Sequence, residues 1–96
     1  MEDLSEKRKE LRSALKEKYS NVLAEMYKEN DTYTEDDLLD KLLTACHGGA
    51  DGVKSVEIRD GIPFLIYGEG AEVNYLELKA EWDEIKEISD KLNPFN

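Results

Sequence analysis

The stretch VKSVEIRDGIPFLIY, residues 53–67, decides the fold class, because it has the pattern of two β-strands in a chain that is otherwise helical in periodicity. Both halves are rich in β-branched and aromatic residues, and Asp60-Gly61 between them is typical of a hairpin turn. Two strands alone do not form a stable sheet, so they must pack on helices or be extended by a partner strand. The stretch therefore predicts an antiparallel hairpin inside a mixed fold.

The register of this hairpin depends on the length of its loop. A two-residue loop would pair Val56 with Leu65, whereas a three-residue loop ending with Gly61 in the left-handed conformation would pair Val56 with Phe64. Pro63 has no N–H to donate, which predicts an edge or a bulge on its side of the strand. We predict the second register, because it collects five apolar side chains on one face: Val56, Ile58, Ile62, Phe64 and Ile66.

The first predicted helix spans residues 4–28 and is long for so short a chain. Asp3 is placed to cap its N-terminus, and Asn30 follows its end. About 25 residues make a rod of roughly 37 Å, so we expect the first two turns to project beyond the core. The apolar residues recur at intervals of three, four and seven, which keeps them on one stripe: Leu4, Leu11, Leu15, Tyr19, Val22 and Met26.

Two shorter helices are predicted over residues 34–47 and 73–92. The first begins at Thr34, whose side chain can cap the helix ahead of three carboxylates, and it ends at Gly48-Gly49. The second has a seam of side chains at alternating intervals of three and four residues, and Pro94 ends it. The predicted order is α-α-β-β-α. It is an α+β fold in which a long helix and two shorter helices pack on a small antiparallel hairpin.

Length and composition indicate a small, highly charged domain. The chain has 96 residues, which predicts one domain over residues 1–96, and 38% of them are charged. Cys46 is the single cysteine, so no internal disulfide can form, and a reducing compartment fits best. The sequence has neither a signal-peptide pattern nor an apolar run long enough for a membrane span. We therefore expect a cytoplasmic protein that does not enter a membrane.

The net charge of −10 is confined to one part of the chain. Residues 1–29 hold seven acidic and seven basic side chains, whereas residues 30–96 hold 16 acidic and 6 basic ones. A negative surface is repelled by nucleic acids and by anionic lipids, so neither is expected as a direct partner. The charge favours instead a basic surface on another protein.

Two helix faces hold most of the acidic excess and form the candidate binding surface. Capping and ordinary solvation explain such faces as well. A mimic of nucleic acid would require the two sets to form one continuous band. The first set lies around the second helix and the second set along the last helix. The candidates are Asp31, Glu35, Asp36, Asp37 and Asp40 in the first set, and Glu77, Glu81, Asp83, Glu84, Glu87 and Asp90 in the second.

The charges of the first helix are segregated to the two sides of its apolar stripe. The basic flank consists of Lys9, Arg12 and Lys16, and the acidic flank of Glu6, Glu10 and Glu17. Flanking charges of this kind steer the pairing of helices. They favour either a contact between the basic flank and an acidic helix of the same chain, or a homodimer through the first helix.

No motif in the sequence indicates an enzyme. Cys46 and His47 are adjacent, but consecutive side chains point about 100° apart on a helix, and the chain has no second Cys or His for a metal site. The glycine-rich residues 48–52 follow a helix and precede a strand, which is the reverse of a phosphate-binding loop. We therefore expect no catalytic residue, no cofactor and no metal ion.

The sequence predicts a non-enzymatic binding protein. Small acidic inhibitors, among them phage-encoded nucleic-acid mimics that block restriction or CRISPR effectors, are similar in size, charge and lack of a catalytic set. The first hypothesis is an anti-defence inhibitor of this kind, whose carboxylates occupy a basic, nucleic-acid-binding surface of a target protein. The alternative is a structural or assembly protein that homodimerises through the long first helix.

Overall fold

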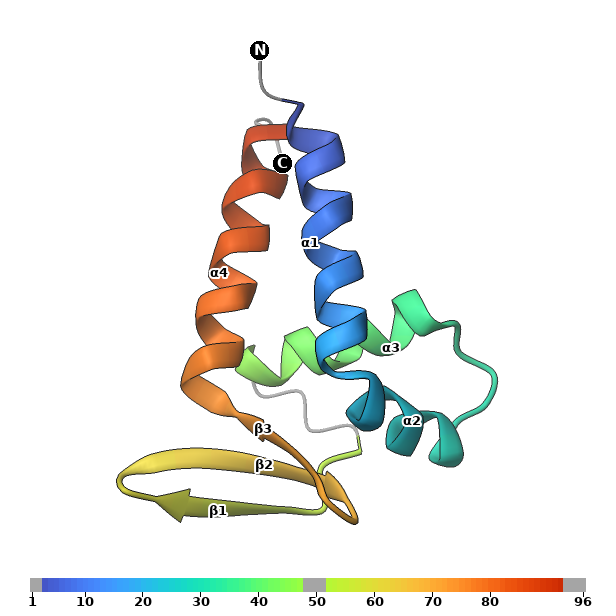
Figure 1. The fold of residues 1–96 in the computed structure, drawn as a ribbon, viewed down its shortest axis with the longest axis vertical. Helices are drawn as coiled ribbons and strands as arrows, with labels where there is room; N and C mark the ends of the chain where they lie inside the picture. Colours follow the sequence, from blue (N-terminus) through green and yellow to red (C-terminus); the bar gives the residue numbers. More distant parts are fainter. Residues whose placement is uncertain (1–2, 48–51, 93–96) are drawn as a thin grey trace.

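A computed structural model describes residues 3–47 and 52–92, and it confirms the predicted α+β class (Figure 1). Gly48-Gly49 and Pro94, predicted to end two helices, lie outside the described residues. Three helices lead into an antiparallel sheet, and a last helix packs on the sheet and on the first helix. The elements are α1 (Leu4–Lys18), α2 (Ser20–Glu29), α3 (Glu35–Leu43), a 3-10 helix η1 (Thr44–His47), β1 (Ser55–Arg59), β2 (Ile62–Gly68), β3 (Ala71–Asn74) and α4 (Tyr75–Leu92).

The single long first helix predicted from the sequence is wrong, because the chain breaks at Tyr19 into α1 and α2. Tyr19 has φ −103° and ψ 23°, outside the helical region, and its side chain is buried. The break lets α2 turn away from α4 and cover the sheet (Figure 1). The first turns of α1 lie along the C-terminal half of α4, where Arg8 Nη1 donates to Ser89 Oγ at 3.4 Å.

The predicted starts of two helices are confirmed at their caps. The Asp3 carboxylate accepts a hydrogen bond from the backbone N–H of Glu6. At α3, the Thr34 hydroxyl accepts from the N–H of Asp37, and the Asp37 carboxylate accepts from the N–H of Thr34. Each cap satisfies backbone donors that have no partner inside the helix. The local sequence therefore determines where α1 and α3 begin.

The sheet has a third strand, β3, which the sequence does not predict. The last helix was expected to begin at residue 73, but it begins at Tyr75, after this strand. The strand order is β1-β2-β3, and all neighbours are antiparallel. Ala71 and Val73 are buried while Glu72 is exposed, which is the alternation of a strand with one covered face. Four residues give too short a pattern to separate a strand from the first turn of the helix that follows. The predicted α-α-β-β-α order is corrected accordingly.

The predicted hairpin register is also wrong, because the loop has two residues instead of three. Val56 pairs with Leu65, and Ile58 pairs with Pro63. Asp60 and Gly61 have φ values of 52° and 80°, the pair of left-handed residues that a type I′ turn requires. The twist of this turn matches the twist of the strands. The apolar side chains of β2 are consequently divided between both faces of the sheet.

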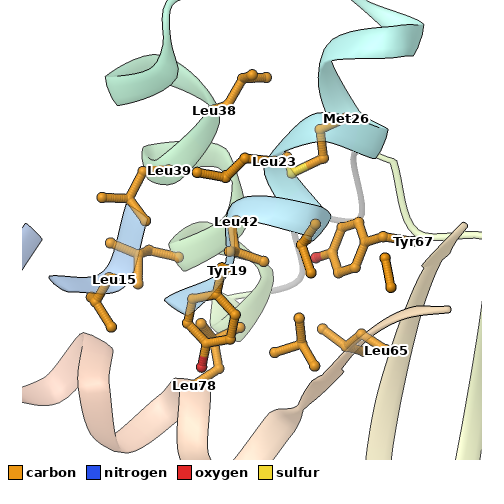
Figure 2. Close-up of a cluster of buried hydrophobic side chains, with 14 of the residues drawn as sticks. Leu15, Tyr19, Leu23, Met26, Leu38, Leu39, Leu42, Leu65, Tyr67 and Leu78 are labelled. Atoms are coloured by element: carbon orange, nitrogen blue, oxygen red, sulfur yellow. The ribbon is translucent and has the colours of Figure 1, made fainter. Parts of the chain in front are cut away.

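The core lies between the helices and one face of the sheet, here called the inner face (Figure 2). Leu39 and Leu42 of α3 and Leu78 of α4 have no exposed surface. Leu65 and Tyr67 reach the core from β2. Strand β1 contributes no buried side chain. Among the described residues, no helix combines the length and apolarity that a membrane span requires.

Candidate functional site

The acidic side chains of α3 face the basic flank of α1 within the same chain. Arg12 Nη1 lies 2.8 Å from an oxygen of Asp40, and Lys16 Nζ lies 2.7 Å from an oxygen of Asp36. The hydrogen bond from Lys16, with a smaller contribution from the nearby Arg12, holds the pKa of Asp36 below its ordinary value. Of the two explanations for the segregated charges of the first helix, the structure supports the contact inside the chain.

Two acidic side chains of α4 meet the C-terminal end of α1. Lys18 is hydrogen-bonded to Glu77 and also to Glu81, whose Oε2 lies 2.7 Å from Lys18 Nζ. Tyr19 donates its hydroxyl proton to the other oxygen of Glu81. Desolvation by itself lowers the pKa of Lys18, but the hydrogen bonds to the two carboxylates outweigh it and raise that pKa. Glu81 thus stabilises the contact between α1 and α4.

Three acidic side chains of α4, Asp83, Glu87 and Asp90, form ion pairs with lysines of the same helix. Three lysines lie four residues from their acidic partners, at 3.3 Å for Lys79 and Asp83, 3.0 Å for Lys86 and Asp90, and 3.5 Å for Lys91 and Glu87. All six side chains are more than half exposed, so each pair contributes only a few tenths of a kcal/mol to the helix, roughly 0.2–0.5. These carboxylates remain accessible to another molecule.

The structure does not bring the two predicted acidic sets together into one continuous band. Helix α1 lies between them, with Arg12 and Lys16 directed to α3 and Lys18 directed to α4. At about 100° per residue, Lys18 points some 120–160° away from the other two. Within the described residues, four of the candidates make no ion pair, and one of these, Asp37, is used in the cap of α3. The other three are Asp31, Glu35 and Glu84.

A hollow between α2 and α3 contains residues that the sequence analysis did not connect. It has a volume of about 520 Å³, and its lining includes Leu23, Tyr27, Lys28, Tyr33, Glu35 and Leu38. Tyr27 is 52% exposed, and the ammonium group of Lys41 lies 4.6 Å from the centre of the Tyr33 ring. No local sequence pattern predicts that these lining residues lie together, because α2 and α3 come into contact only in the folded chain.

Glu35 lines both this hollow and a second one. The second hollow lies at the junction of α1, α2 and α3, and Ser13, Lys16, Glu17 and Ser20 line it together with Glu35. Glu17, like Glu35, makes no ion pair within the described residues. An apolar surface with two tyrosines is therefore continuous with a surface that carries two carboxylates. We call these two hollows together the α2–α3 groove.

The charged residues of the hairpin are bound to one another on the face of the sheet away from the core, here called the outer face. Arg59 lies 2.8 Å from Glu72 of β3 and 3.0 Å from Glu57 of its own strand, and its guanidinium group lies 4.9 Å from the centre of the Phe64 ring. The hydrogen bond from Arg59 lowers the pKa of Glu72, and the same contact raises the pKa of Arg59. Arg59 thus bridges all three strands.

The described residues contain no group of three His, Cys, Asp or Glu side chains arranged to hold a metal ion. Cys46 and His47 lie in η1, and their side chains are outside the described part of the structure. Comparison of the chain with protein-family models, with curated proteins and with solved structures gave no match.

Proposed function

We propose that the protein is a non-enzymatic binding module that engages a basic surface of another protein through the α2–α3 groove. The observation that carries the proposal is the composition of this groove. Tyr27 and Tyr33 provide apolar contact area beside the carboxylates of Glu35 and Glu17. The groove also has two lysines, but Lys16 is paired with Asp36 and Lys28 with Glu25, whereas the two carboxylates have no basic partner within the described residues. Tyrosine is enriched where binding energy is concentrated in protein interfaces, and a partner with an apolar anchor flanked by Lys or Arg would complement the groove.

The distribution of charge supports the same proposal. No charged side chain is buried among the described residues, so the described carboxylates of residues 30–96 are at least partly exposed, and those without a basic partner in the chain are available to another protein. A field of this sign accelerates the encounter with basic proteins and disfavours nucleic acids. Asp31 lies in the connection between α2 and α3, the helices that form the first hollow, and adds to the negative charge of this part of the chain.

The two narrower hypotheses from the sequence have less support than this proposal. An anti-defence inhibitor that mimics nucleic acid needs a continuous row of carboxylates, and α1 separates the acidic sets of α3 and α4. A homodimer through the first helix needs a free apolar seam, yet Leu15 is buried and the basic residues Arg12 and Lys16 have partners inside the chain. No observation favours the second hypothesis over the binding module.

The experiment starts with a pull-down from host lysate, followed by calorimetric titration of each purified partner. We expect a doubly substituted variant, Tyr27→Ala with Glu35→Gln, to lose about tenfold or more in affinity, as hot-spot residues do. The matched control is Asp83→Asn with Asp90→Asn, which removes two exposed charges from α4 and is expected to change affinity less than about threefold. Binding that is unaffected by the groove variant and insensitive to ionic strength would contradict the proposal.

A further inference from the structure

Strand β1 is an open sheet edge with apolar side chains that nothing in the described chain covers. All five of its residues are exposed, and Val56 and Ile58 are 54% and 65% exposed. Both side chains lie on the inner face, since Val56 pairs with Leu65, which pairs in turn with the buried Val73. The helices cover this face over β2 and β3, but β1 lies beyond them (Figure 1).

Pro63 determines which backbone groups of β1 face the open edge. In an antiparallel ladder, residues opposite each other either exchange two N–H···O bonds or direct these groups away from each other, and the two kinds of pair alternate. Ile58 pairs with Pro63, which has no N–H, so this pair is of the second kind. The N–H and C=O of Ile58 therefore point away from β2. At the open edge, Ile58 presents free backbone hydrogen-bonding groups beside an exposed apolar side chain.

The charges of β1 are complementary to a second copy of the same strand. Glu57 and Arg59 lie on the outer face, two residues apart and of opposite sign. If two β1 strands run antiparallel about a twofold axis at Ile58, each Glu57 lies opposite an Arg59, and the two Ile58 side chains meet. An axis at Glu57 would instead oppose two carboxylates. An axis at Val56 would place Glu57 opposite the uncharged Ser55, so the charge pattern favours the register with the axis at Ile58.

We propose that β1 pairs with β1 of a second copy in this register and joins the two three-stranded sheets into one. The proposal is independent of the partner groove, which lies between α2 and α3. The strand has only five residues, so the contact is smaller than the roughly 800 Å² per partner of a standard interface, and a reversible dimer of modest affinity is expected. At physiological ionic strength the Debye length is about 8 Å, which screens the repulsion between the acidic helices more than the contacts within the ladder.

Sedimentation equilibrium of the full chain, from micromolar to millimolar concentration, tests this dimer. We expect the unmodified protein to show a reversible monomer–dimer equilibrium. Glu57→Arg alone and Arg59→Glu alone should each weaken it by about tenfold or more, because like charges then face each other across the axis. An equimolar mixture of the two variants should restore association, since each Arg of one chain then lies opposite a Glu of the other.

The mixture of the two variants distinguishes two explanations for weaker association, namely loss of the proposed contact and loss of folding. Arg59→Glu also removes the bridge to Glu72, so its fold must be checked by circular dichroism; Glu57→Arg leaves that bridge in place. A folding defect in one chain would not be repaired by the other chain's charge reversal. A monomer at every concentration, self-association of each variant as strong as that of the unmodified protein, or a mixture that fails to associate would each overturn the proposal.

Discussion

We predict that the hydrogen bond from Tyr19 to Glu81 stabilises the break between α1 and α2, and the substitution Tyr19→Phe tests this prediction. Tyr19 is buried at the break, and its hydroxyl donates to the carboxylate of Glu81 on α4. Replacing Tyr19 by Phe removes the donor and keeps the ring. We expect this change to destabilise the protein, because the carboxylate of Glu81, whose side chain is only 19% exposed, loses one of its two partners while Lys18 remains.

The expected loss follows from the environment of the bond. A hydrogen bond to a charged group contributes about 1.5–3 kcal/mol to stability. The Glu81 side chain is 19% exposed, so water can partly replace the hydroxyl, and we expect a loss of about 1–2 kcal/mol for Tyr19→Phe. With about 2.1 cal/mol/K of unfolding entropy per residue, a chain of 96 residues should show a Tm lower by about 5–10 °C.

A double-mutant cycle of Tyr19→Phe with Glu81→Ala measures the interaction itself. Unfolding in urea, followed by circular dichroism, should give a coupling free energy of about 1 kcal/mol or more between the two side chains. The matched control is Tyr27→Phe, which removes a hydroxyl from a ring that is 52% exposed and should cost less than about 0.5 kcal/mol. A coupling below about 0.3 kcal/mol, within the usual additivity of independent sites, would refute the reasoning.

Two further predictions concern the core and the acidic face of α3. Leu39→Ala, at a position with no exposed surface, should cost about 2–5 kcal/mol in urea unfolding, whereas the same change at Leu76, which is 53% exposed, should cost less than about 0.5. The lowered pKa of Asp36 means that its ion pair contributes stability above the unfolded pKa of 3.8 and loses that contribution as pH falls through the lower folded value. An NMR titration of the Asp36 carboxyl should therefore give a higher pKa in Lys16→Met than in the unmodified chain.

The parts of the fold that depend on short-range interactions were predictable. The caps at Asp3 and Thr34 follow from side chains that lie within three residues of the N–H groups they bind. The sequence predicts the Asp60-Gly61 turn but not its register, because collecting the apolar side chains on one face favours a three-residue loop. In the structure the turn geometry decides the register, and Arg59 covers Phe64 on the outer face.

The candidate site was predictable in composition but not in arrangement. Charge counting located the acidic residues on α3 and α4, yet it could not show that Asp36, Asp40, Glu77 and Glu81 already have basic partners inside the chain. These partners are up to 63 residues away in sequence. The sequence likewise does not show that Tyr27 and Tyr33 share one groove, because the packing of α2 on α3 brings them together.

The sequence by itself determined the α+β class, the helix starts at Asp3 and Thr34 and the position of the hairpin turn, because these depend on local periodicity and on capping within one turn of the chain. Only the tertiary structure decided the break at Tyr19, the third strand and which charged side chains have partners inside the chain. A break, a short strand and an ion pair between helices gain their stability from burial and from groups distant in sequence. The acidic surface left for a partner is accordingly a property of the folded chain, whereas its sign is a property of the sequence.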